Sequence, residues 1–333
     1  MPELPDVTVY IERLRALFTG AVLEGVRIRS PSLLRTADPP LASAFGRKVV
    51  GFERLGKRVV TELEGELFLV LHLMIAGRLK LKPNGAGIPG KIGMAAFDYD
   101  RGSLLLTEAS SHKRTQLSVV QGRAGLAAHD PGGLEVLECS REAFAEALRR
   151  ENHTIKRSLT DPRLLSGIGN AYSDEILHRA KLSPVKLTQK FDDAAIERLF
   201  TACRAVLTEW TDRLREQTGD GWPEQVTAFR PEMAVHGKYG QPCPVCGATV
   251  QRIVHASNET NYCPTCQTEG RLLSDRALSR LLKQDWPRTP AELEERKERL
   301  RGGTEITPEH PGPKPGAAIQ RPAHVKARPK GSD

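Results

Sequence analysis

Cys243-Pro244-Val245-Cys246 is followed, after sixteen residues, by Cys263-Pro264-Thr265-Cys266, and these two motifs decide how the C-terminal part of the chain folds. Each short pair of cysteines forms a knuckle, and the residues between the pairs form a hairpin that returns the second pair to the same ion. Four thiolates complete the coordination sphere of Zn²⁺, so the metal has no open position for chemistry. The spacing therefore predicts one structural zinc ion.

Length and charge describe a two-domain protein with a polyanionic partner. The chain has 333 residues, a net charge of +8 and 39% hydrophobic residues, enough for one or two ordinary cores. An excess of Lys and Arg favours phosphate-bearing partners, because these side chains displace condensed counterions. No stretch resembles a signal peptide or is long enough to cross a bilayer. We expect a soluble, cytoplasmic protein, in which Cys139 and Cys203 are ordinary buried thiols.

The region before the zinc motifs has helical periodicity from about residue 141 to residue 216. Between two of these helices lies Gly167-Ile168-Gly169-Asn170. Glycines there allow a tight turn, and the free N–H groups of the next helix suit a phosphate oxygen. A plain helix–helix turn with Asn170 as the cap is the alternative. Residues 219–228, around Gly221-Trp222-Pro223, have the composition of a mobile loop.

Residues 21–120 consist instead of short β-rich runs separated by turn signals such as Glu64-Gly65 and Asp100-Arg101-Gly102. Examples of these runs are residues 48–52, 59–63, 67–71, 94–99 and 103–106. Runs of this kind predict an antiparallel sandwich or barrel. Before them, apolar residues from Val7 to Phe18 recur at helical spacing, and Gly20 provides a stop. One amphipathic helix therefore follows the N-terminus directly.

The N-terminus itself is a candidate reactive group. The chain opens Met1-Pro2-Glu3, and loss of Met1 leaves the secondary amine of Pro2 as the terminus. An α-amino group titrates near 7.7–8.0, roughly two units below lysine, so part of it is unprotonated at neutral pH. Attack on a sugar carbon gives a positively charged iminium ion. Such an ion draws electrons from its neighbours and so favours elimination.

Taken together, the terminal Pro-Glu, the β-rich region, the helices around Gly167–Asn170 and the four cysteines resemble the formamidopyrimidine-DNA glycosylase/endonuclease VIII family over residues 2–286. The resemblance implies an α+β fold: an antiparallel β-sandwich with an N-terminal helix, a helix-two-turns-helix domain, and a zinc-binding β-hairpin. We place the sandwich domain at residues 1–130 and the helical domain at 131–230. The zinc finger and a following helix then occupy 231–286, and a basic, disordered tail 287–333.

The same resemblance assigns roles to individual residues. Pro2 would attack the sugar C1′ of a damaged nucleotide, and Glu3 would act as general acid and base. Lys57 would lie in the lesion site and contact the phosphate backbone, which His72 and Asn170 would grip on either side of the lesion. Each has an ordinary alternative: a charge favouring the following helix for Glu3, an exposed turn for Lys57, and a structural histidine for His72.

Three positions depart from the family pattern, and all concern recognition. Ile75 stands where the family has a methionine wedge, with Met74 one residue earlier and therefore expected on the other face of a strand. Residues 108–115 lack the usual phenylalanine, so Arg114 or His112 would contact the base opposite the lesion. Asn258 replaces an arginine of the zinc hairpin, which removes a bidentate phosphate contact. These changes leave the preferred lesion open.

The resemblance implies a DNA repair enzyme, a glycosylase and abasic-site lyase that nicks the strand by β- and δ-elimination. Its partner would be double-stranded DNA with damaged bases or abasic sites, bound by a monomer associated with the nucleoid. The alternative is a zinc-dependent protein that binds damaged DNA without excising bases. A weaker alternative is a structural zinc protein that acts on RNA.

Overall fold

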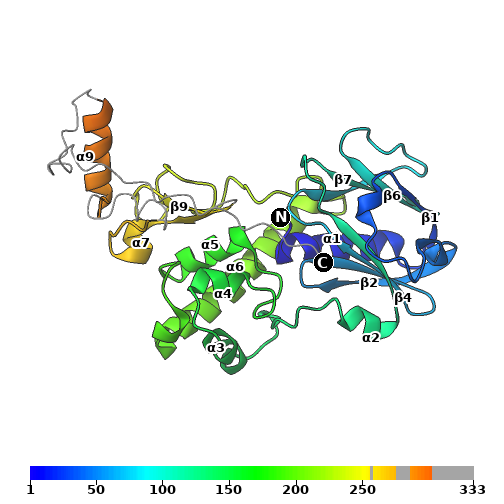
Figure 1. Cartoon of the computed structure of the whole chain (residues 1–333), viewed down its shortest axis with the longest axis horizontal. Coiled ribbons are helices and arrows are strands. Elements are labelled where there is room, and N and C mark those ends of the chain that lie inside the picture. The colour runs from blue at the N-terminus through cyan, green and yellow to red at the C-terminus, as the bar shows by residue number, and fades with distance from the viewer. Residues whose placement is uncertain (256–257, 275–285, 302–333) are drawn as a thin grey trace, which may run out of the picture. The chain divides into compact units, whose positions relative to one another are not determined.

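The computed structural model describes residues 1–255, 258–274 and 286–301. The chain divides into two compact units, residues 1–290 and 291–333. The first unit contains a β-sandwich, a group of helices and a C-terminal β-hairpin, coloured from blue through green to yellow in Figure 1. This order confirms the predicted fold class.

Eight antiparallel strands build the sandwich, and their order is β5-β7-β6-β1-β2-β3-β4-β8. Strand β1 pairs along its length with β6 but with β2 only at two positions, Val22 with Lys48 and Leu23 with Arg47. The ladder therefore folds at this short pairing into two facing layers. The strands are β1 (Val22–Ile28), β2 (Arg47–Leu55), β3 (Arg58–Leu63), β4 (Leu67–His72), β5 (Gly77–Lys82), β6 (Gly93–Tyr99), β7 (Gly102–Glu108) and β8 (Gln116–Gln121).

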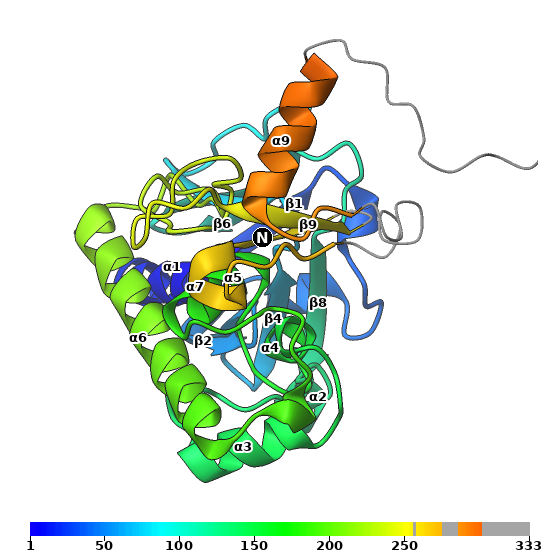
Figure 2. The same ribbon diagram turned by 90° about the vertical axis from the view of Figure 1, so that its left-hand side faces the viewer.

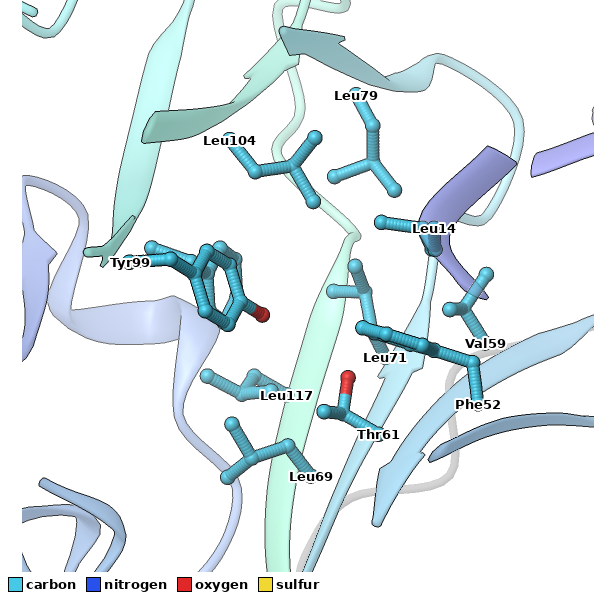
Figure 3. Close-up of a pocket in the computed structure, with 11 residues that line it drawn as sticks. Leu14, Phe52, Val59, Thr61, Leu69, Leu71, Leu79, Tyr99, Leu104 and Leu117 are labelled. Carbon is cyan, nitrogen blue, oxygen red and sulfur yellow. The ribbon is translucent and has the colours of Figure 1, made fainter. Parts of the chain in front are cut away.

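Alternate side chains along each strand point inward and form the core between the two layers. Figure 3 shows Leu79, Tyr99 and Leu104 from one layer facing Leu69, Leu71 and Leu117 from the other. The space they enclose is only about 10 Å³, which is room for roughly one water molecule. This interior gap is a packed core and no ligand site.

Helix α1 (Leu4–Phe18) joins the sandwich to the helices. Pro5 occupies its first turn, where a missing N–H costs nothing. Its apolar face, including Val7, Leu14 and Phe18, belongs to the sandwich core. Because α1 also contacts α6 (Asp193–Thr218), the N-terminus lies where the sandwich meets the helices (Figure 1).

The helical region has its own core, centred on Phe144, Ile176, Leu199 and Leu207. Ser140 and Asp192 cap α3 and α6 by accepting from the backbone N–H three residues later. Figure 2 shows the long helix α6 along one side of these helices. The other helices of this region are α3 (Arg141–Arg149), α4 (Ile155–Thr160) and α5 (Asn170–Arg179). The short helix α2 (Gly122–Ala127) packs instead on β4 and β8 of the sandwich.

The hairpin consists of β9 (Gln251–His255) and β10 (Asn258–Tyr262), followed by the short helix α7 (Pro264–Thr268). The second unit contributes helix α9 (Pro290–Arg301), within the tail expected to be disordered. A glutamate in its first turn and the Glu295–Arg299 ion pair favour this helix. The tail after Arg301 lies outside the described residues. Of the helical structure expected after the hairpin, the described residues include α7.

One local expectation was wrong. Residues 74–76 form a turn between β4 and β5 and no part of a strand, and Met74 adopts a positive φ of 52°. Met74 and Ile75 therefore do not alternate across a sheet. In the part of the chain that the structure describes, no helix has both the length and the apolar character needed to cross a bilayer.

Leu104→Ala tests the packing of the sandwich. Leu104 is 4% exposed and lines the core, so truncation leaves a cavity and should cost about 2–5 kcal/mol in the free energy of unfolding. Urea denaturation measures this. Val50→Ala, at a side chain 52% exposed, should change stability by no more than about 0.5 kcal/mol. Equal effects of the two changes would contradict the two-layer core.

Candidate active site

The carboxylate of Glu3 binds the N-terminus of helix α5. Its oxygens accept hydrogen bonds from the backbone N–H groups of Gly169 (2.6 Å), Ala171 (2.9 Å) and Tyr172 (3.3 Å). Glu3 is only 2% exposed, and the free N–H groups and the dipole of a helix N-terminus favour a negative charge there. Glu3 thus caps a helix far along the chain, and it is also the N-cap residue of α1.

Two glycines make this approach possible. A Cβ on Gly169 would lie 2.5 Å from Cδ of Glu3, and a Cβ on Gly167 would lie 2.8 Å from Cβ of Leu4. Gly167 also has φ of +80°, a region that glycine adopts without strain. Its carbonyl accepts from the N–H of Leu4 at 2.9 Å. The turn whose N–H groups could suit a phosphate therefore binds the start of the chain.

The chain terminus and Lys57 share this location. Pro2 is buried, and burial lowers the pKa of the terminal amine, which Met1 carries in this structure, against the opposing charge of Glu3. Lys57 lies in the turn between β2 and β3, half-buried, and its Nζ donates to the carbonyl of Ile168 at 2.7 Å. Burial lowers the pKa of Lys57 as well. Two amines with lowered pKa values therefore flank one carboxylate.

A buried ion pair that the sequence did not reveal lies directly behind Glu3. Asp6 accepts from the backbone N–H of Glu3 (3.0 Å) and from Nη2 of Arg230 (2.9 Å). The two side chains are 3% and 8% exposed. Burial raises the pKa of Asp6 and Arg230 opposes that rise. The pair ties the first turn of α1 to the segment that precedes the hairpin.

Helix α5 extends this framework to the hairpin. The Glu175 carboxylate accepts from the N–H groups of Ala234 (2.8 Å), Val235 (2.9 Å) and His236 (2.9 Å). Asp174 is fully buried between Nζ of Lys156 (2.5 Å) and Nδ1 of His236 (2.7 Å). One helix therefore holds Glu3 at its first turn and the bend at residues 234–236 a turn later.

The four paired cysteines meet at one point. The Sγ atoms of Cys243, Cys246, Cys263 and Cys266 all lie within 4.8 Å of one another, close to the spacing of about 3.8 Å that tetrahedral Zn–S bonds of about 2.3 Å require. Nε2 of His178, on α5, lies 3.3 Å from Sγ of Cys243. These thiolates suit a structural Zn²⁺ with no open position, as the sequence predicts.

The side chains of Asn170 and His72 each form a hydrogen bond within the protein. Gly169, and not Asn170, is the N-cap of α5, and Nδ2 of Asn170 donates to the carbonyl of Glu259 in β10 at 3.0 Å. His72 ends β4, and its Nδ1 accepts from the N–H of Met74 at 3.1 Å. Burial, with Arg58 and Lys57 nearby, lowers the pKa of His72 to about 4. His72 is therefore neutral at physiological pH.

Of the residues at the three departures from the family pattern, Ile75 and Arg114 lie on loops and Asn258 begins β10. Ile75 is 55% exposed at the tip of its turn. Arg114 is exposed in the loop after β7, whose backbone is held by the buried Glu108 carboxylate through the N–H groups of Arg114 and Thr115. Asn258 is exposed beside His255 in the hairpin register. Their roles stay predictions.

Residues 219–230 pass close to the N-terminus and are packed against α1 and β5. Trp222 donates from Nε1 to the carbonyl of Leu79 (2.9 Å), and its ring lies 5.4 Å from that of Tyr10. Arg78 donates from Nε to the carbonyl of Val226. A groove of about 410 Å³ opens between β5, β7 and residues 224–227.

Gly169→Ala should break the docking of Glu3. The new methyl group would displace the carboxylate from its N–H donors, and overpacking of this kind costs about 1–3 kcal/mol. Urea denaturation measures the loss. Gly87→Ala is the control, since a Cβ there has nothing within 4 Å, and it should stay within about 1 kcal/mol. Equal stability of the two variants would contradict this account of Glu3.

Removal of zinc should unfold the hairpin alone. The metal's coordination energy is local to four cysteines, whereas the sandwich has its own core. A chelator should abolish hydrogen-exchange protection in β9 and β10, leave the sandwich strands protected, and weaken DNA binding. Loss of protection in the sandwich strands would show that the metal supports more than the hairpin.

Comparison with known proteins agrees with this architecture. The profile "Formamidopyrimidine-DNA glycosylase N-terminal domain" matches residues 1–130, "Formamidopyrimidine-DNA glycosylase H2TH domain" matches 133–217, and "Zinc finger found in FPG and IleRS" matches 240–268. An uncharacterized formamidopyrimidine-DNA glycosylase-like protein of Mycobacterium tuberculosis is 42% identical over 151 residues, which are 45% of this chain and 94% of that protein.

Full-length relatives give the same result. The crystal structure of MutM (Fpg) from Thermus thermophilus is similar with a TM-score of 0.68 and 32% identity, over 80% of this chain and 98% of that one. Fpg of Lactococcus lactis, non-covalently bound to DNA containing an AP site, is similar with a TM-score of 0.70 and 25% identity, over 80% and 99% of the two chains. A formamidopyrimidine-DNA glycosylase of Thermus thermophilus is 33% identical over 287 residues, which span 81% of this chain and 100% of the relative. With its three domains matched in order, the chain belongs to the formamidopyrimidine-DNA glycosylase family.

Proposed function

We propose that this protein is a DNA glycosylase and abasic-site lyase that uses the Pro2 amine as its nucleophile. The observation that carries the proposal is the buried terminus, held beside the Glu3 carboxylate by the first turn of α5. In this structure Met1 carries the terminal amine, and burial favours its uncharged form. Pro2 is buried as well, so we expect the same of its amine once Met1 is removed, and only the uncharged amine has a lone pair to attack carbon. Membership of the family supports the same reaction.

The first step exchanges one bond for another at the sugar C1′. The Pro2 nitrogen bonds to C1′, the bond from C1′ to the damaged base breaks, and the base leaves with the electron pair. Glu3 is positioned for the proton transfers of ring opening, because its neighbour Pro2 brings the sugar to it. Three N–H donors hold the Glu3 carboxylate in place, so its orientation is fixed before substrate arrives.

The Pro2 nitrogen then loses its proton, Glu3 protonates O4′ as the bond from C1′ to O4′ breaks, and the nitrogen lone pair forms an iminium ion. This ion makes strand cleavage possible. It acidifies C2′, so that loss of a proton there expels the 3′ phosphate. A second elimination would expel the 5′ phosphate, and water would release the enzyme. Both steps separate a phosphate from the sugar, and the Lys57 ammonium lies near enough to Glu3 to affect the same site. We assign Lys57 to charge stabilisation at these phosphates.

The remaining predicted contacts fit a role in holding extruded DNA. A base inside a duplex shields its C1′, so the nucleotide must leave the stack. Ile75 is an exposed apolar side chain in the turn before β5, and it is suited to fill the space that the extruded base leaves in the duplex. His72, Arg114, Asn170 and Asn258 would contact the backbone or the opposite strand. The partner would be duplex DNA with a damaged base or an abasic site, bound by a monomer in the cytoplasm.

Blocking the terminal amine should abolish covalent trapping. We expect wild-type protein to form a borohydride-stable complex with a duplex that contains an abasic site. An uncleaved extension before Pro2 converts the amine to an amide, which is not nucleophilic, and should remove the complex. The same extension placed after Asp333 is the control, and Pro2→Gly should trap weakly because it offers a primary amine. Binding without trapping on every substrate would favour the alternative of a damaged-DNA sensor.

The pH dependence of trapping should report the buried amine. Burial lowers the pKa of the terminal amine that Met1 carries. We expect the buried Pro2 amine to respond in the same way once Met1 is removed, so its reactive, unprotonated form should persist at a lower pH than for an exposed α-amine, near 7.7–8.0. Under single-turnover conditions the rate should fall as pH decreases, with a midpoint below that range. Titration of His72 should add no second inflection to the pH–rate profile near pH 6.5, because the pKa of His72 is about 4. A midpoint above 8 would contradict a desolvated nucleophile.

A further inference from the structure

We propose that Arg78 and Lys80 determine which bases this protein excises, by donating hydrogen bonds to carbonyl oxygens of a base extruded into the groove between β5 and residues 224–227. The inference rests on the proposed glycosylase function and names the class of base that it would prefer. That class is oxidised bases with carbonyl-rich edges, such as oxidised uracils and hydantoins.

The groove has the size and lining of a site for a small, polar ring. Its volume of about 410 Å³ falls within the range of about 300–1,000 Å³ that is typical of small-molecule sites. One wall comes from β5 and β7 and the other from the segment after α6. The lining includes Arg78, Lys80 and Thr107 on the first wall and Glu224, Gln225 and Thr227 on the second.

The alternation of β5 places both cations in this groove. Leu79 is 1% exposed and points into the sandwich core (Figure 3). Arg78 and Lys80, on either side of it, therefore lie on the opposite face. Both are half-buried, so a hydrogen bond from either is screened less than one at an open surface.

Arg78 is rigidly held but retains a free donor. Its Nε donates to the carbonyl of Val226, and its Nη1 donates to those of Ile75 (3.2 Å) and Gly77 (2.7 Å). Across residues 1–255, 258–274 and 286–301, neither Nη2 of Arg78 nor the Lys80 ammonium has a hydrogen-bond partner. These hydrogen bonds hold the guanidinium group of Arg78 in place, and its Nη2 stays available to a ligand.

The groove lies beside the reacting amine. Arg78 bonds to the turn that carries Ile75, and Ala76 of the same turn lines the groove. The charge of Arg78 acts on both the terminal amine and Asp6. A nucleotide whose C1′ meets Pro2 would therefore direct its base toward this wall.

The hydrogen-bonding groups of the two walls favour a base with carbonyl oxygens beside a ring N–H. Arg78 and Lys80 can only donate, so they suit carbonyl oxygens and repel exocyclic amino groups. Glu224 on the opposite wall is an acceptor for a ring N–H, and within the described residues it takes part in no ion pair. A ring with carbonyls beside an N–H satisfies both walls, whereas a ring with an amino group in place of a carbonyl leaves cations unpaired.

The matched pair of 5-hydroxyuracil and 5-hydroxycytosine tests this selection. They differ at position 4, where the first has a carbonyl and the second an amino group, and at N3, which carries a hydrogen only in the first. We expect wild-type protein to excise 5-hydroxyuracil from a duplex roughly tenfold faster under single-turnover conditions, as expected from one hydrogen bond to a charged donor. Arg78→Gln should lower this ratio at least roughly fivefold, and Lys80→Gln should lower it in the same direction.

Two controls keep the test decisive. Lys82→Gln changes an exposed lysine of β5 outside the groove and should leave the ratio unchanged. Lys80→Gln disrupts no internal hydrogen bond, so its effect cannot be attributed to a displaced 224–227 segment. Equal excision of the two bases by wild type, excision of neither, or a parallel fall for both in the Arg78 and Lys80 variants would overturn the inference. Failure of wild type to trap at an abasic site would instead contradict the proposed function.

Discussion

Everything near the N-terminus depends on the bond between the Glu3 carboxylate and the first turn of α5. That bond joins residue 3 to residues 169–172, so it also joins the sandwich to the helices. A buried carboxylate is costly unless donors satisfy it, and here three backbone N–H groups do so. Gly167 and Gly169 are required because the two chain segments approach too closely for a Cβ. These contacts of Glu3 fix the neighbouring chain terminus in a desolvated position.

Helix α5 carries this arrangement to the zinc centre. Its residues Glu175 and His178 contact, in turn, the backbone of 234–236 and Sγ of Cys243. Asn170 adds a bond to β10. The zinc hairpin is therefore positioned by the same helix that positions Glu3, although the metal takes no part in the chemistry. A hairpin docked in this way can hold one side of a DNA backbone while the terminus reaches the sugar.

The sequence predicted what depends on local chemistry. Four cysteines at fixed spacing meet around one point, and the strands near residues 48–52, 59–63, 67–71, 94–99 and 103–106 form as expected. Strands β1, β5 and β8 lie in the predicted β-rich region but were not among the runs named. Charged residues such as Arg27 and Lys80 interrupt the apolar runs of β1 and β5, although β5 does alternate. The partners of Asp6 and Glu175 could not be predicted, since Arg230 and residues 234–236 are distant in sequence and have no local signature. Local sequence offered two interpretations of Gly167–Asn170, a phosphate site and a turn capped by Asn170, and neither indicated that Glu3 would bind the N–H groups there.

Two amines, those of the chain terminus and Lys57, have pKa values lowered by burial beside Glu3, so either could in principle attack a sugar. The location of the covalent bond decides between them. The abasic-site complex should be reduced with borohydride, digested with trypsin and analysed by tandem mass spectrometry. The account predicts the deoxyribose remnant on the nitrogen of Pro2, within the peptide that ends at Arg13. A remnant on Lys57, with the Pro2 peptide unmodified, would contradict it.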